Sequence, residues 1–156
     1  MTSQHAGTPA APGTGRPASP FLAPIEIDGL LFLSGQLPYV DGALASTGTV
    51  GGEVSVAEAQ EAARVAAELV LARVERDYGL DRVRAVARLT VYVASAPGFV
   101  DQPSVANAAS AAFVAALGDR GRHSRSAVGV AALPKGAPVE VEATLAITPA
   151  DAVSPG

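Results

Sequence analysis

The chain has 156 residues with a formal net charge of −4, and 49% of its residues are hydrophobic. This length suits one domain with its own core, so an active site would lie inside that domain or between subunits. The acidic balance argues against nucleic acid and against an anionic membrane surface as partners. With no cysteine and two widely separated histidines, His5 and His123, the sequence excludes disulfides, thiol nucleophiles and a histidine-based metal centre.

Two terminal segments are expected to stay outside the folded domain. Residues 1–20 consist mostly of Pro, Gly, Ser, Thr and Ala and predict a flexible tail, and residues 149–156 predict a second tail. The domain is therefore expected over 21–148. No apolar run reaches the ~18 residues of a membrane span, and no signal-peptide pattern opens the chain, so we expect a cytoplasmic protein.

A β-hairpin and a helix are expected first. Asp28-Gly29 separates two short apolar runs, and this dipeptide favours the tight turn of a hairpin; Asp41-Gly42 predicts a second turn. Ser55-Val56-Ala57-Glu58 is a capping box, and apolar residues then recur at helical spacing. A helix is therefore predicted over about 55–78, ending before Gly79.

A strand and a second helix follow. Residues 83–94 alternate with a period of two and predict a half-buried strand, whose buried face is expected to carry Ala85, Ala87, Leu89, Val91 and Val93. Asp101 or Gln102 is expected to cap the second helix, with Pro103 in its first turn and Gly118 at its end.

The last two strands are predicted over 124–131 and 139–147, which gives the element order β-β-α-β-α-β-β. This order predicts an α+β fold, a mixed sheet with two helices on one face. The other face carries small and polar residues and is left without a cover, so we expect it to be buried by oligomerisation.

Charged residues near these strands carry little information by spacing alone. Glu140 and Glu142 are two apart and share a strand face, and His123 and Arg125 share another. Two carboxylates on a strand usually mark a solvated face, and a lone Arg is usually a surface charge. Spacing therefore leaves both a structural and a functional role open for these residues.

The combination of motifs is more specific. The segments are Ser34-Gly35-Gln36-Leu37-Pro38, Arg125-Ser126-Ala127-Val128, Leu133-Pro134-Lys135-Gly136 and Val139-Glu140-Val141-Glu142-Ala143. In this order they resemble the RidA/YjgF family of enamine and imine deaminases over about residues 21–147. The run over 121–130 is similar to the chorismate-mutase-like branch of that family.

The resemblance implies a fold, an assembly and a chemistry. The fold would be chorismate-mutase-like, and three copies would form a homotrimer around a central barrel of sheets, with a site at each subunit interface. The family needs no cofactor and no metal. Its substrates are small carboxylate-bearing enamines and imines such as 2-aminoacrylate, which it hydrolyses to 2-keto acids and ammonia.

The same resemblance implies roles for particular residues. Arg125 would bind the substrate carboxylate, Glu140 would hold the attacking water, and Asn107 would help to frame the site. The backbone at Gly35 and around Ala127 would line the pocket. Phe21 stands where typical deaminases carry a Tyr, and Ala127 replaces a frequent Cys.

Three alternatives remain beside the deaminase. The first is a non-catalytic trimer that binds small carboxylates through Arg125. The second is a pathway enzyme, an isomerase or deaminase, that acts on a bulkier biosynthetic intermediate. The third is a ribonuclease, which the net charge of −4 makes the least favoured.

Overall fold

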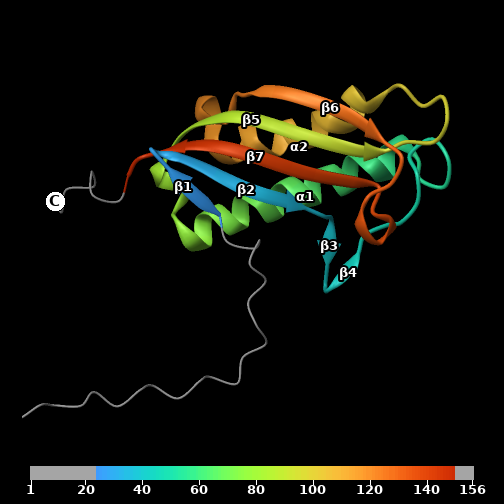
Figure 1. The fold of residues 1–156 in the computed structure, drawn as a ribbon, viewed down its shortest axis with the longest axis horizontal. Coiled ribbons are helices and arrows are strands. Elements are labelled where there is room, and N and C mark those ends of the chain that lie inside the picture. The colour runs from blue at the N-terminus through green and yellow to red at the C-terminus, as the bar shows by residue number, and fades with distance from the viewer. Residues whose placement is uncertain (1–23, 150–156) are drawn as a thin grey trace, which may run out of the picture.

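The computed structural model describes residues 24–149, which form one sheet with two long helices behind it (Figure 1). The predicted N-terminal tail, Phe21, and all of the predicted C-terminal tail except Pro149 lie outside the described residues. The strands are β1 (Ile25–Ile27), β2 (Leu30–Gln36), β3 (Tyr39–Val40), β4 (Ala43–Leu44), β5 (Val83–Ala94), β6 (Ser124–Val130) and β7 (Val139–Ile147). The helices are α1 (Val56–Asp77), α2 (Gln102–Leu117) and the short 3-10 turns η1 (Leu80–Arg82), η2 (Gly118–Gly121) and η3 (Pro134–Gly136).

The main sheet has the strand order β1-β2-β7-β5-β6. Strands β5 and β6 run parallel, and the other neighbours in this sheet run antiparallel, so the sheet is mixed. The predicted α+β fold with both helices on one face is confirmed. The structure adds one small element, because the predicted turn at Asp41-Gly42 joins two short strands, β3 and β4, into a hairpin.

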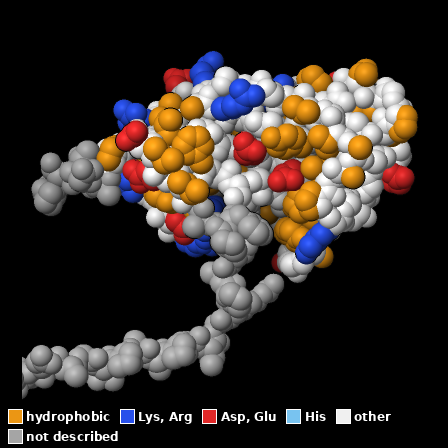
Figure 2. Space-filling view, viewed as in Figure 1, with side chains coloured by type: hydrophobic (Ala, Val, Ile, Leu, Met, Phe, Trp, Pro, Cys, Tyr) orange, Lys and Arg blue, Asp and Glu red, His pale blue; other side chains and the backbone are white. Residues whose placement is uncertain are grey.

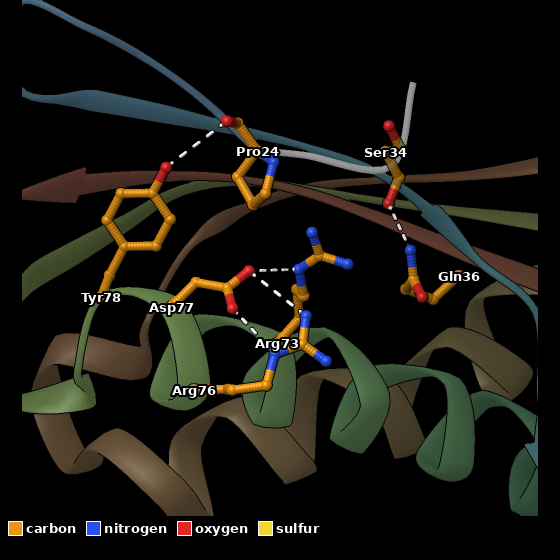
Figure 3. Close-up of polar contacts among 7 residues, drawn as sticks. All are labelled: Pro24, Ser34, Gln36, Arg73, Arg76, Asp77 and Tyr78. Carbon is orange, nitrogen blue, oxygen red and sulfur yellow. Dashed lines mark hydrogen bonds and ion pairs between the residues drawn. The ribbon is translucent and has the colours of Figure 1, made fainter. Parts of the chain in front are cut away.

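Local polar contacts stabilise the first turn of helix α1, and ion pairs lie near its last turn. At its start, the Ser55 hydroxyl accepts from the amide of Glu58 and the Glu58 carboxylate accepts from the amide of Ser55, so the predicted capping box is present. At its end, Asp77 pairs with Arg73 and Arg76, as Figure 3 shows. The buried side of α1 is mostly alanine, which lets the helix backbone lie close to the sheet and to α2.

The core lies between the sheet and the two helices. Strand β7 runs through its centre and alternates without interruption: Val139, Val141, Ala143, Leu145 and Ile147 are buried. Phe113 of α2 is the largest fully buried side chain among the described residues. Because every second residue of β7 faces the helices, Glu140 and Glu142 face the other side of the sheet.

Strand β5 departs from the predicted alternation. Its register against β7 shifts twice, between Val83 and Ala85 and between Val86 and Arg88. Each shift is an irregularity of the β-bulge kind, which moves the following side chains to the other face. Val86 is therefore buried while Ala87 is exposed, and the prediction that Ala85 and Ala87 share the buried face was wrong.

The start of α2 also differs in detail from the prediction. Asp101 is the residue that precedes the helix, but its side chain makes no capping hydrogen bond to the helix backbone. Its carboxylate instead accepts from the Ser104 hydroxyl at 2.7 Å. Pro103 lies in the first turn and Gly118 follows the last residue, as predicted.

The face of the sheet away from the helices is uncovered in a single chain. Figure 2 shows this open face, on which apolar side chains gather over β1 and β2 and acidic side chains lie near the centre. Exposed large apolar residues of these two strands are Ile25, Ile27, Leu30 and Phe32. The register pairs Ile25 with Phe32 and Ile27 with Leu30, so the four side chains share one face.

Candidate functional site

Arg125 lies on β6 and reaches the neighbouring helix α2. Its Nη1 donates to Asn107 Oδ1 at 3.0 Å and to Ser110 Oγ at 3.0 Å. Asn107 and Ser110 are three residues apart, so they lie one helical turn apart on the same face of α2. Within residues 24–149, Arg125 has no carboxylate partner, and its Nε and Nη2 groups have no hydrogen-bond partner. The guanidinium is therefore held from one side and available to an anion on the other.

The register places Arg125 on the helix face of the sheet. Arg125 pairs with Leu89 and Ala127 pairs with Val91 in the parallel ladder between β6 and β5. Leu89 and Val91 are fully buried against the helices, and paired residues of neighbouring strands point to the same side. Strand β6 is also an edge of the main sheet, so Arg125 and Ala127 lie where a second chain or a ligand can approach.

Glu140 lies on β7 directly over the backbone of Gly35. An ideal Cβ built on Gly35 would lie 1.8 Å from Glu140 Oε1 and 2.7 Å from its Cδ. The absence of a side chain at position 35 therefore makes room for the Glu140 carboxylate. The ladder between β2 and β7 is interrupted here, because the register steps from Leu33–Ala143 to Gln36–Val141.

The backbone around Gly35 is held by a side chain of its own strand. Gln36 Nε2 donates to the carbonyl of Ser34 at 3.0 Å and to that of Gly35 at 3.1 Å, and Figure 3 shows the first of these bonds. Bulged segments of this kind are common next to active sites, where they redirect a strand locally. The bulge and the glycine together give the Glu140 carboxylate its place on the open face.

The electrostatics of Glu140 are set by burial and by a second carboxylate. Partial burial raises the pKa of Glu140 above its ordinary value, and the negative charge of Glu142 raises it further. The Tyr92 hydroxyl donates to Glu142 at 3.3 Å, and burial together with the two glutamates raises the pKa of Tyr92. Glu140 is thus a carboxyl group that retains a proton more readily than a solvated glutamate, a property of acid–base catalysts.

The structure brings the candidate residues together in two pairs. Arg125 contacts Asn107 on the helix face, and Gly35 lies against Glu140 on the open face. The two pairs do not meet within one chain, because β6 and β7 are separated by β5 and the side chains point to opposite sides. Phe21 lies outside the described residues.

Two residues next to Arg125 were not among the predicted site residues. Ser110 accepts from the Arg125 guanidinium, and His123 contacts Ser110 at 2.9 Å. The sequence carried a partial signal for both. His123 and Arg125 share a strand face by their spacing, and Ser110 lies one turn after Asn107.

Neither a metal centre nor a membrane span is found in the described part of the chain. No group of three or more His, Asp or Glu side chains in residues 24–149 could hold a metal ion. Over the same residues, no helix is long and apolar enough to cross a membrane.

Comparisons with known proteins agree with this architecture. Residues 11–147 match a family model described as endoribonuclease L-PSP. Protein TCP17 of Trypanosoma cruzi is 42% identical over 134 residues, which cover 85% of this chain and 84% of that protein. The crystal structure of Atu1372 from Agrobacterium tumefaciens, a protein of unknown function, is 43% identical, with a TM-score of 0.81 and 84% of each chain covered. RidA from the Antarctic bacterium Psychrobacter sp. PAMC 21119 is 27% identical, with a TM-score of 0.54 over 84% of this chain and 93% of that one.

These similarities settle the class of protein. The mixed sheet with two helices on one face is the chorismate-mutase-like α+β fold. The chain belongs to the endoribonuclease L-PSP family, which is the RidA/YjgF family, and the predicted resemblance is confirmed.

Proposed function

We propose that this protein hydrolyses small enamine and imine carboxylates to 2-keto acids and ammonia. The observation that carries the proposal is the set of contacts that the Arg125 guanidinium makes. Its guanidinium is oriented by Asn107 and Ser110 through Nη1 alone and has no carboxylate partner in residues 24–149. A guanidinium edge with two free donors fits a carboxylate, which can accept from both at once.

The proposed reaction needs a proton donor or acceptor and a water. An enamine such as 2-aminoacrylate takes a proton on its terminal carbon and gives one up from its nitrogen, and so becomes an imine. Water adds to the imine carbon and gives a carbinolamine. Its C–N bond then breaks, the bonding electrons leave with the protonated nitrogen as ammonia, the hydroxyl loses its proton, and the 2-keto acid remains. We assign the positioning and deprotonation of that water to Glu140, whose pKa is raised by partial burial and by the charge of Glu142, so that it is a stronger base than a solvated glutamate. The backbone around Gly35 and Ala127 would line the pocket.

A site that uses both Arg125 and Glu140 takes them from different copies of the chain. The two side chains lie on opposite faces of the sheet, so the proposal includes a homotrimer in which the apolar open face is buried. Light scattering at micromolar concentration is expected to give about three times the chain mass of 15.5 kDa. A monodisperse monomer in this measurement would contradict both the proposed trimer and the proposed site shared between subunits.

A ribonuclease, the activity in the family's name, needs a surface that binds a phosphate backbone, whereas the deaminase needs a small carboxylate site. A net charge of −4 and acidic side chains at the centre of the open face do not favour a phosphate backbone as ligand (Figure 2). We propose that the reaction takes place in the cytoplasm. Phe21 occupies the position of a common Tyr, so the substrate is expected to differ from those of typical deaminases.

The deciding experiment is an ammonia-release assay on 2-aminoacrylate generated enzymatically in the cuvette. Release of ammonia above the spontaneous rate, abolished in Arg125→Ala, supports the proposal. Binding of keto acids without ammonia release would replace the enzyme with a carboxylate-binding trimer. Activity confined to bulkier imines would point to the pathway enzyme. Cleavage of an RNA oligonucleotide without ammonia release above the spontaneous rate would replace the deaminase with the ribonuclease.

A further inference from the structure

A chain of hydrogen bonds connects Arg125 to the backbone of the turn before β6. His123 Nδ1 lies 2.6 Å from the carbonyl oxygen of Gly121, and His123 Nε2 lies 2.9 Å from Ser110 Oγ. Ser110 Oγ in turn lies 3.0 Å from Nη1 of Arg125. The hydrogen bonds thus run from the Gly121 carbonyl through His123 and Ser110 to Nη1 of Arg125.

For a neutral His123, chemistry fixes the direction of these bonds. A carbonyl oxygen can only accept, so Nδ1 of His123 carries a hydrogen. In the neutral ring Nε2 then accepts, and the Ser110 hydroxyl donates to it. The lone pairs of Ser110 Oγ are left to accept from Arg125, which is always a donor. The donor and the acceptor of each hydrogen bond in this series are therefore defined. Removing the Ser110 hydroxyl would break the connection between His123 and Arg125.

The histidine is itself fixed by the backbone. A Cβ on Gly121 would lie 2.2 Å from the carbonyl oxygen of Phe113 and 2.9 Å from Cα of Val114, so η2 can lie this close to α2 only with glycine there. The ring of Phe113 packs edge-on against His123 with a centroid separation of 6.1 Å. These contacts leave the imidazole little freedom, so it can serve as a rigid support.

We propose that Ser110 and His123 are positioning residues for Arg125. They hold Nη1, together with Asn107, and so present the Nε–Nη2 edge to the substrate carboxylate. Nη1 has two hydrogens, and its two bonds to Asn107 and Ser110 account for both. The carboxylate is then bound side-on by Nε and Nη2 and not end-on by the two terminal nitrogens. This inference rests on the proposed role of Arg125 as the carboxylate anchor.

Four single variants of the full-length protein and the double variant Ser110→Ala/His123→Phe test the proposal. Ser110→Ala removes the hydroxyl, Ser110→Thr keeps it, and His123→Phe keeps a packed ring without its nitrogens. Ser104→Ala is the matched control, because Ser104 lies on the same helix and bonds to Asp101 instead of Arg125. Two readouts are used: the affinity for 2-ketobutyrate by calorimetry, and the NMR signals of the Arg125 guanidinium without ligand, assigned by their loss in Arg125→Lys.

The expected effects on binding, turnover and NMR signals distinguish a positioning role of Ser110 and His123 from a purely structural role. Ser110→Ala and His123→Phe should each weaken 2-ketobutyrate binding about three- to tenfold, the effect of one lost hydrogen bond, and the double variant should be no weaker than Ser110→Ala alone. In turnover, KM should rise while kcat stays near the parent value. Ser110→Thr should restore affinity, and Ser104→Ala should not change it. The Nη1 signal of Arg125 should shift and broaden in Ser110→Ala but not in Ser104→Ala.

Failure of this inference can be told apart from failure of the proposed function. An Arg125 signal that is the same in Ser110→Ala as in the parent overturns the positioning role, whatever the protein binds. Unchanged affinity in Ser110→Ala, in a parent that binds 2-ketobutyrate, overturns it as well. A parent that binds no 2-ketobutyrate contradicts the proposed function, and the ligand-free NMR comparison then decides the positioning of Arg125 alone.

Discussion

Arg125 and Glu140 lie on opposite faces of one sheet, with β5 between the strands that carry them. A small ligand cannot touch both side chains in a single copy, because the sheet and its core-facing side chains lie between them. If both residues take part in the proposed reaction, a neighbouring copy of the chain has to supply one of them. The proposed function therefore predicts that assembly is a condition for activity.

Mixing two impaired variants tests the shared site. Arg125→Ala and Glu140→Gln should each release little ammonia alone, since each removes one residue from every site of its own trimer. When the two are unfolded, mixed in equal amounts and refolded, random assembly gives about one quarter of sites with both residues intact, because each site draws one residue from each neighbour. Ammonia release should recover to that fraction of the parent. No recovery in mixed trimers confirmed by mass would mean that both residues serve the same copy's site.

Arg125→Lys should bind keto acids about one to two decades more weakly than the parent, because lysine keeps the charge but loses the planar pair of donors. The matched control is Arg122→Lys, three residues earlier, whose side chain is 78% exposed and pairs with Asp119. Calorimetric titration with 2-ketobutyrate measures both. Parent-like affinity in Arg125→Lys would show that the carboxylate anchor lies elsewhere.

Gly35→Ala should lower turnover while the fold survives. The added methyl would occupy the place of the Glu140 carboxylate, and a flexible side-chain end can move away at small cost. The melting temperature is therefore expected to change little, while ammonia release falls toward the level of Glu140→Gln. The double variant Gly35→Ala/Glu140→Gln should be no slower than Glu140→Gln, since both changes act on one group. An additive loss in the double variant would mean that Gly35 acts independently of Glu140.

Most of the fold could be predicted from the sequence because its signals are local. The capping box at Ser55 and the alternation along β7 each act over a few residues, and both are present as expected. The bulges of β5 were missed because they depend on its pairing with β7, a contact between distant segments. The same reason applies to the site. Arg125 and Glu140 could be named from a motif, but neither the two faces on which they lie nor the contact of His123 with Ser110 follows from spacing along the chain.

Glu140→Gln should lower turnover and leave stability unchanged or improved at neutral pH. The pKa of Glu140 is raised in the folded protein, so the ionised carboxylate opposes folding as the pH rises through its titration range. Glutamine keeps the shape and removes that cost, as expected where a catalytic group is kept at the expense of stability. Thermal unfolding at pH 7.5 and ammonia release give the two quantities. A fall of several degrees in melting temperature would indicate that Glu140 is a structural residue.

Glu142→Gln should move the pH dependence of the reaction toward acid. Burial is the larger cause of the raised pKa of Glu140, and the charge of Glu142 is the second. Removing that charge lowers the pKa of Glu140 without returning it to the ordinary value, because the burial remains. The base must be ionised to act, so kcat/KM rises with pH as Glu140 loses its proton, and a lower pKa shifts that rise to lower pH.

The measurement is a profile of kcat/KM against pH for the parent and two variants. Glu142→Gln is compared with Glu61→Gln, which removes one negative charge from the exposed side of α1, where Glu61 pairs with Arg64. The acid limb should move in the first variant and not in the second, because the effect comes from the neighbouring carboxylate and not from net charge. An acid limb that stays in place in Glu142→Gln, or moves to higher pH, would show that the charge of Glu142 does not raise the pKa of the base. Either burial alone would then raise the pKa of Glu140, or the observed ionisation would belong to the substrate or to another group.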